Sequence, residues 1–215
     1  MAVAGELGIL SIVDGAHAPG QLDIDLPAIG ADFFTGNCHK WLMAPKGAGF
    51  LYVRPECQDL IEPLIVSWGY KNDLTHSRSK FLDYLVWSGT DDPAAYLAVP
   101  DAIQYQESHD WRGIRMSCHE ILGHAIEQIC TLSGLGNPYG NNSTLYHQMG
   151  IAPLPHIRDL NALKACLYDD YHIEVPLIEW NQQHFIRISV QGYNSQDDIV
   201  ALIQALEKLL PEYSD

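Results

Sequence analysis

Three short apolar runs constrain the fold of the first half of the chain. They cover residues 8–14, 31–35 and 48–53, and each is bounded by Gly, Pro or Asp. Apolar runs of this length are typical of strands that are buried on both faces of a sheet. The order of elements therefore predicts an alternating α/β segment, followed by an appended α+β segment.

Two residues with distinctive chemistry stand just after the first two runs. Asp14 ends the first run, and Lys40 follows the second in Asn37-Cys38-His39-Lys40. In an open parallel sheet ligands collect at the carboxyl ends of the strands, where both residues would lie. A lysine amine can form an imine with an aldehyde cofactor, and a carboxylate can keep a pyridine nitrogen protonated. On residue types alone, a turn-capping Asp14 and a solvated Lys40 are the simpler interpretation.

These residues belong to a longer ordered pattern. Its parts are Val13-Asp14-Gly15-Ala16-His17, Thr35-Gly36-Asn37-Cys38-His39-Lys40-Trp41, Pro45-Lys46-Gly47-Ala48-Gly49, Trp87-Ser88-Gly89-Thr90, and Phe185-Ile186-Arg187-Ile188-Ser189 followed by Tyr193-Asn194. In this order they resemble the class V aminotransferase family of fold-type I pyridoxal phosphate enzymes, and within it the isopenicillin N epimerase branch. The resemblance spans nearly all of the chain.

The resemblance implies a domain organisation. Residues 1–110 would be the carboxyl-terminal part of a fold-type I cofactor-binding large domain, and residues 111–215 a small α+β carboxyl-terminal domain with its linking helix. Members of the family are roughly twice as long as this chain of 215 residues, so we expect it to be a carboxyl-terminal half, either from a truncated gene or as a fragment. In the family, the earlier part supplies a glycine-containing phosphate loop and an aromatic residue stacked on the ring.

The resemblance also assigns three catalytic roles. Lys40 would form the Schiff base with pyridoxal 5'-phosphate and move protons at the substrate α-carbon. Asp14 would pair with the pyridinium nitrogen, and His17 would contact the phenolic oxygen of the ring. Without the motif, His17 would be interpreted as a histidine satisfied by nearby backbone.

Three further residues are implied in cofactor binding. Asn37 and His39 would donate hydrogen bonds to the phosphate, although a serine often stands at the position of Asn37 in the family. Thr90 would reach the phosphate of the neighbouring subunit, which implies a homodimer with shared active sites. A helix amino terminus capped by Thr90 or Asp92 is compatible with that role.

Arg187 is the residue implied in substrate binding. It alternates with Ile186 and Ile188, so its side chain should point away from theirs, and in the family this arginine forks onto the substrate α-carboxylate. A surface salt bridge is the alternative. The implied reaction is epimerisation, transamination or lyase chemistry at the α-carbon of an amino acid.

Cysteine desulfurase chemistry is disfavoured. Desulfurases of this family need a nucleophilic cysteine on a loop shortly before the carboxylate-binding arginine, and residues 171–183 contain none. The nearest candidate, Cys166, lies within a predicted helix and is expected to pack in the core. We likewise expect Cys38 to be a packing residue.

Two alternatives from other classes remain open. In the first, the chain alone is inert, because it supplies only part of the phosphate-binding site and of the residues that hold the two faces of the cofactor ring. A metal hydrolase could use Asp14, His17, His39 and His76, since carboxylates and imidazoles bind zinc, but these residues lack a recognised ligand spacing such as HExxH.

Composition limits the partners and the location. Hydrophobic residues make up 47% of the chain, enough for a core, and no apolar stretch is long enough to cross a bilayer. The amino terminus lacks the layout of a secretion signal, which favours a cytoplasmic location. Five cysteines without CxxC spacing argue against a disulfide scaffold or a zinc site. A net charge of −15 argues against nucleic acid and anionic membranes as partners.

Other patterns predict the remaining elements. A helix should end near residue 7, and further helices should cover 92–108 and 111–132, before a loop at 134–143. An edge strand is predicted at 149–155, a helix capped by Asp159, a hairpin of 173–180 with 184–190, and a last helix capped by Ser195.

Overall fold

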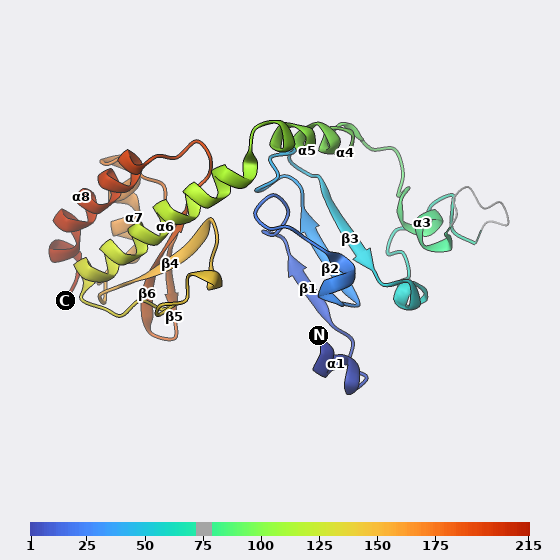
Figure 1. The fold of residues 1–215 in the computed structure, drawn as a ribbon, viewed down its shortest axis with the longest axis horizontal. Helices are drawn as coiled ribbons and strands as arrows, with labels where there is room; N and C mark the ends of the chain where they lie inside the picture. Colours follow the sequence, from blue (N-terminus) through green and yellow to red (C-terminus); the bar gives the residue numbers. More distant parts are fainter. Residues whose placement is uncertain (72–78) are drawn as a thin grey trace. The chain divides into compact units, whose positions relative to one another are not determined.

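The chain forms two compact units in the computed structural model, which describes residues 1–71 and 79–215. The units are Met1–His109 and Asp110–Asp215. Each has its own three-stranded sheet, with the strand order β1-β2-β3 in the first unit and β4-β6-β5 in the second (Figure 1). Helices and strands mix in both units, so the predicted α/β class is confirmed.

The three apolar runs of the first unit are strands, as predicted. β1 (Ile12–Gly15) pairs in parallel with β2 (Phe33–Asn37), and β3 (Gly49–Val53) runs antiparallel to β2. In the parallel register Asp14 lies beside Thr35. The carboxyl ends of β1 and β2 therefore meet at one edge of the sheet, where ligands collect in such sheets.

The prediction that all three strands are buried on both faces is wrong for β1 and β3. Phe50 and Leu51 of β3 are 38% and 44% exposed. Phe33 and Phe34 of β2 are buried, but Ile12 of β1 is 74% exposed. β1 and β3 are the edge strands of this sheet, and no helix in the described part of the chain covers Ile12. An apolar run indicates a strand, but it does not tell whether a second layer is present to cover it. An exposed apolar edge of this kind is a surface for strand pairing or association.

One helix predicted for the first unit is divided into two. The predicted helix 92–108 is two helices, α4 (Ala94–Leu97) and α5 (Val99–Ser108). Pro100, in the first turn of α5, lacks an amide hydrogen and cannot continue the preceding helix. The predicted first helix is confirmed as α1 (Ala2–Glu6), and the short helices α2 (Leu26–Ile29), η1 (Pro55–Leu60) and α3 (Lys80–Leu85) complete the unit.

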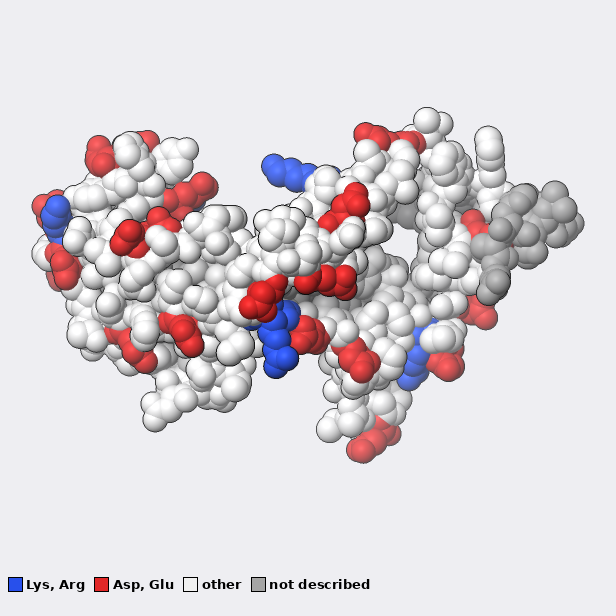
Figure 2. Space-filling view, turned by 45° about the horizontal axis from the view of Figure 1, so that its top comes forward, with Lys and Arg blue, Asp and Glu red and all other residues white. Residues whose placement is uncertain are grey.

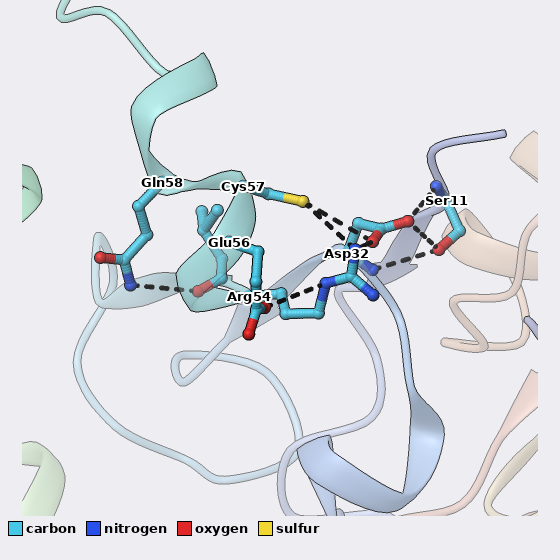
Figure 3. A network of polar contacts seen from close by, with 7 residues as sticks. Ser11, Asp32, Arg54, Glu56, Cys57 and Gln58 are labelled. Atoms are coloured by element: carbon cyan, nitrogen blue, oxygen red, sulfur yellow. Dashed lines mark hydrogen bonds and ion pairs between the residues drawn. The ribbon is translucent and has the colours of Figure 1, made fainter. Parts of the chain in front are cut away.

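A polar network ties the strands together at the other end of this sheet, where β1 and β2 begin (Figure 3). The Asp32 carboxylate is nearly buried and accepts hydrogen bonds from the Ser11 amide at 2.7 Å and the Ser11 hydroxyl at 2.9 Å. It also pairs with the Arg54 guanidinium at 2.8 Å and contacts the Cys57 thiol at 3.7 Å. The hydrogen bonds from Ser11 and the charge of Arg54 lower the pKa of Asp32 below its ordinary value of 3.8.

Replacing Asp32 with Asn should lower the thermal unfolding temperature at neutral pH, with a smaller loss at acid pH. The pKa of Asp32 is depressed in the folded chain, so its stabilisation is full above the ordinary value of 3.8 and is lost as the pH falls toward the folded value. Unfolding curves of wild type and Asp32→Asn at pH 7 and pH 3 measure this. An unchanged difference between the two pH values would contradict the prediction. The exposed Asp59→Asn variant is the control.

The second unit contains most of the elements predicted for it. α6 (Trp111–Ser133), β4 (Met149–Leu154), α7 (Leu160–Asp169), β6 (Gln183–Ser189) and α8 (Gln196–Tyr213) match their predicted positions, with a short turn η2 (Ser143–Leu145) beside the loop. Asp159 accepts a hydrogen bond from the Ala162 amide at 2.9 Å, and Ser195 forms a capping box with Asp198. Both predicted caps are confirmed.

The predicted hairpin is shorter than expected in its first strand. β5 is Leu177–Trp180, whereas a strand was predicted from residue 173. Pro176 has no amide hydrogen and cannot donate to a ladder, although its carbonyl still accepts from the Arg187 amide at 3.0 Å. β4 lies at the edge of the sheet, as predicted.

One face of the second sheet carries the main core. Ile186 is fully buried and Ile188 is 3% exposed, and both pack in one cluster with residues of α6, α7 and α8. Since side chains alternate along a strand, Arg187 lies on the opposite face. Figure 2 shows acidic side chains over the visible face of the molecule, as the net charge requires. In the described ranges, no helix combines the length and apolar character needed to cross a membrane.

Candidate functional site

A loop after β1 brings His17 to the chain that follows β2. The Ala18 amide donates to the Gly15 carbonyl at 2.8 Å, and the Gln21 side chain donates to the His17 carbonyl at 2.8 Å. Gly20 has a φ of +85°, and a Cβ there would lie 2.4 Å from the backbone of Trp41. Only glycine fits this close approach, so the loop lies directly against the segment that carries Lys40.

Hydrogen bonds and apolar packing hold the segment that carries Lys40 in place. The Cys38 amide donates to the Ala48 carbonyl at 3.0 Å, and the Gln106 side chain of α5 donates to the Trp41 carbonyl at 3.0 Å. Cys38 is 7% exposed and packs with alanines of this segment and of α4 and α5, as predicted. In Figure 1, α4 and α5 lie at the end of the sheet where β1 and β2 finish.

His17, Lys40 and Trp41 form a contact triad at this edge. The Lys40 Nζ lies 3.3 Å from His17 Nε2, and the Trp41 indole N–H donates to His17 Nδ1 at 3.0 Å. Across residues 1–71 and 79–215 no carboxylate pairs with the Lys40 amine. The amine is thus positioned by an imidazole and is not tied up in an ion pair.

Asp14 stands exposed at the carboxyl end of β1. One carboxylate oxygen accepts from the Ala16 amide at 2.9 Å, which closes a local turn. For the other oxygen the described residues supply no partner. The turn-capping interpretation of Asp14 is therefore correct for one oxygen, while the second can accept from a ligand N–H, as a protonated pyridine requires. No contact joins Asp14 to Lys40.

The two predicted phosphate ligands lie where β2 ends. Asn37 is the last residue of β2 and pairs with Gly49. The His39 Nδ1 lies 2.8 Å from the Ala48 carbonyl oxygen, which only accepts, so Nδ1 carries a proton. A neutral His39 then presents an unprotonated Nε2. Only the imidazolium form can donate from Nε2 to a phosphate oxygen, so His39 would bring a positive charge to that group.

Thr90 is exposed before α4. The Asp92 carboxylate accepts from the Ala94 amide at 2.9 Å, but the N-cap residue of α4 is Pro93, so neither predicted cap residue takes that position. Thr90 makes no hydrogen bond to any described residue.

Arg187 lies in the second unit with part of its guanidinium buried. Its Nε is buried without a hydrogen-bond partner, and no described carboxylate pairs with it, so the alternative of a surface salt bridge is not found among the described residues. Arg187 lines a cavity of about 310 Å³ together with Glu174, Ser189, Asn194 and Asp198. A buried donor without a partner costs free energy, and an added carboxylate would satisfy it.

Other candidate groups do not assemble. Within residues 1–71 and 79–215, no three His, Cys, Asp or Glu residues are placed to hold a metal ion, and His76 lies outside the described residues. Cys166 lies in α7 with its thiol 3.4 Å from the Asp170 carboxylate. Burial, and then the Asp170 contact, raise the pKa of Cys166, which disfavours the thiolate that a nucleophilic cysteine needs.

Trp41 lies within the motif that carries Lys40, but no role for it could be predicted from the sequence. A side-chain bond between two loops depends on how both loops fold, so sequence spacing could not predict it. The one available signal was an aromatic residue with an N–H donor directly after the candidate lysine.

Both the sequence and the fold are similar to those of known proteins. The profile described as Aminotransferase class-V matches residues 1–202. The isopenicillin N epimerase of Amycolatopsis lactamdurans is 33% identical over 210 residues, which cover 94% of this chain and 53% of that protein. The isopenicillin N epimerase of Streptomyces clavuligerus is 34% identical over 214 residues, which cover 95% and 54%. The putative L-cysteine desulfhydrase 1 of Oryza sativa subsp. japonica is 29% identical over 239 residues, which cover 99% and 48%.

Solved structures share the fold. The apo cysteine desulfurase of Thermococcus onnurineus NA1 superposes with a TM-score of 0.77 and is 23% identical, covering 98% of this chain and 55% of that one. This likeness concerns the fold alone. The chain spans about half the length of the curated relatives it matches.

Proposed function

Since the chain belongs to the class V aminotransferase family, whose members depend on pyridoxal phosphate, we propose that it carries the cofactor lysine of such an enzyme and acts at the α-carbon of an amino acid. The observation that carries the proposal is the placement of the Lys40 amine against His17, without a carboxylate partner among the described residues, at the edge of the sheet where β1 with Asp14 ends. The donor set fits the cofactor, because an amine, a carboxylate with one free oxygen and amide and imidazole donors lie on adjacent loops.

Each residue has a distinct task in this proposal. Bound pyridoxal phosphate would supply an electron-withdrawing ring that stabilises negative charge at the substrate α-carbon. Lys40 would hold the aldehyde carbon and then move the α-proton with its amine. Asp14 would accept the N–H of the ring, and His17 would donate to the ring oxygen.

Phosphate binding would fall to residues on two subunits. Asn37 and His39 would donate from the end of β2, and Thr90 would donate to the phosphate of a second subunit in a homodimer. The exposed Thr90 hydroxyl without a bond in the described residues supports this role. A cavity-lining Arg187 with a buried unpartnered Nε supports the role of carboxylate ligand for the substrate.

Isotope exchange tests the reaction class. The cofactor-loaded protein is incubated with an L-amino acid in D₂O, and the α-proton, the chirality and the products are followed by NMR. Exchange with appearance of the D-form supports epimerisation, a keto acid supports transamination, and loss of a side-chain group supports lyase chemistry. If the protein carried pyridoxal phosphate on Lys40 but exchanged the α-proton of no amino acid, action at the α-carbon would be contradicted.

Replacing His39 with Gln should weaken binding of the cofactor on the order of tenfold, because a charged donor to the phosphate is lost. The carboxamide can still donate, so the loss concerns the charge. Equilibrium binding of pyridoxal phosphate and of pyridoxal, which has no phosphate, measures this. Equal losses for both aldehydes would contradict a phosphate contact.

A second candidate is that the 215-residue chain is inert by itself. Its support is that the chain spans about half of its relatives and leaves apolar residues such as Ile12 exposed on the edge strand β1. If this candidate holds, the chain alone should associate in solution and bind little cofactor. Size-exclusion chromatography with an absorbance scan tests this, and a monodisperse protein eluting with a cofactor band would show that the chain suffices.

A further inference from the structure

The His17 ring lies between two groups that can compete for it. The Trp41 indole nitrogen is 3.0 Å from Nδ1, and the Lys40 amine is 3.3 Å from Nε2. An indole N–H can only donate a hydrogen bond, and a lysine ammonium can likewise only donate. A neutral imidazole has one accepting nitrogen, so it cannot accept from both groups at once.

The surroundings of Trp41 decide which bond is kept. Trp41 is 7% exposed, its carbonyl is bound by the Gln106 side chain, and its backbone lies against Gly20. A buried indole N–H without a partner costs free energy. Lys40 is only half-buried, so water can satisfy its amine. The Trp41 bond is therefore favoured, and the imidazole proton sits on Nε2, facing Lys40.

We propose that Trp41 is a positioning residue whose indole N–H holds His17 in the Nε2-protonated tautomer. This tautomer removes the acceptor that a Lys40 ammonium would need. It offers a donor to the neutral Lys40 amine, which has a lone pair that can accept. Trp41 thus favours the nucleophilic form of Lys40 through His17. The inference deepens the proposed function, because it rests on Lys40 as the reacting amine.

The tautomer can be read directly in the chain without cofactor. In a ¹⁵N-histidine-labelled chain, the His17 signals are those that disappear in the His17→Gln variant. At a pH where the ring is neutral, we expect Nδ1 to have the chemical shift of an unprotonated nitrogen and Nε2 that of a protonated one. A proton on Nδ1 would overturn the proposal. The proposed function is tested separately, by attachment of the cofactor to Lys40. A failure of the proposed function would therefore appear as a missing cofactor label, and not as a different His17 tautomer.

The effect on Lys40 can be read by reductive methylation with ¹³C-formaldehyde and cyanoborohydride, followed by peptide mapping. The rate at Lys40 is divided by the rate at Lys46, which is exposed in the same unit. In Trp41→Phe we expect this ratio to fall about tenfold, because His17 becomes free to accept from the Lys40 ammonium and stabilises it. The control Trp180→Phe removes an exposed indole elsewhere and should leave the ratio unchanged.

A double-mutant cycle separates this coupling from a general loss of structure. In the His17→Gln background, Trp41→Phe should not change the ratio further, because Trp41 acts through His17. An unchanged ratio in Trp41→Phe with His17 present, or an equal fall without His17, would overturn the proposal. Circular dichroism checks that the variants fold. If Trp41→Phe does not fold, the tautomer of the wild-type chain decides alone.

Discussion

An Asp14→Asn variant of the cofactor-loaded protein is expected to keep its fold and some bound cofactor, and to remove the substrate α-proton about 10³-fold more slowly. Asp14 is exposed and makes one local bond, to the Ala16 amide, so its replacement should not disturb the sheet. A neutral amide cannot stabilise a protonated ring nitrogen, and an unprotonated ring is a weaker electron sink. Single-turnover measurement of α-proton exchange reports this step.

The matched control for Asp14 is Glu107→Gln, which neutralises an exposed carboxylate on α5 outside the site. It should leave the exchange rate unchanged. Near-normal exchange in Asp14→Asn would show that Asp14 has a structural role only, as its turn-capping bond alone would suggest.

Replacing Arg187 with Met should separate function from stability. We expect kcat/KM for the amino-acid substrate to fall about 10²-fold, because a two-point contact with the α-carboxylate is lost. We expect the free energy of unfolding to stay within about 0.5 kcal/mol or to rise, since the variant removes a buried donor that has no partner. Steady-state kinetics and denaturant unfolding measure the two quantities.

Arg54→Met is the control for Arg187. Arg54 pairs with Asp32 at 2.8 Å, so its loss should lower the unfolding temperature. If Arg187→Met were destabilised as much as Arg54→Met while keeping its kcat/KM, Arg187 would be a structural residue and the carboxylate role would be wrong.

Local signals explain why much of the fold could be predicted. The helix caps at Asp159 and Ser195 act within one turn, and the buried stripe of α8 repeats at helical spacing, so neither depends on distant parts of the chain. The predictions of element bounds and burial were wrong where a single proline or a distant part of the chain decided the structure. Pro100 divided a predicted helix, Pro176 shortened a strand, and the exposure of Ile12 depended on a covering layer that periodicity cannot report.

The candidate site was predicted less completely than the fold. Sequence motifs pointed to Lys40, His17 and Asp14, and the structure brings the first two into contact. The bond from Trp41 to His17 joins two loops, and the Asp32 network joins the ends of strands that are far apart in the chain. Such pairings follow from tertiary packing. For Asp32, a carboxylate inside an apolar run followed by an arginine after the next strand was a usable signal.

Covalent trapping tests most directly whether Lys40 is the residue that carries pyridoxal phosphate. The cofactor-loaded protein is reduced with borohydride, digested and mapped by mass spectrometry, with Lys40→Ala as the matched control. We predict a pyridoxyl group on the peptide that contains Lys40 and none in the variant. A pyridoxyl group on Lys46 or Lys71 would contradict the assignment of Lys40. So would the absence of a pyridoxyl group from every peptide of a protein that binds the cofactor.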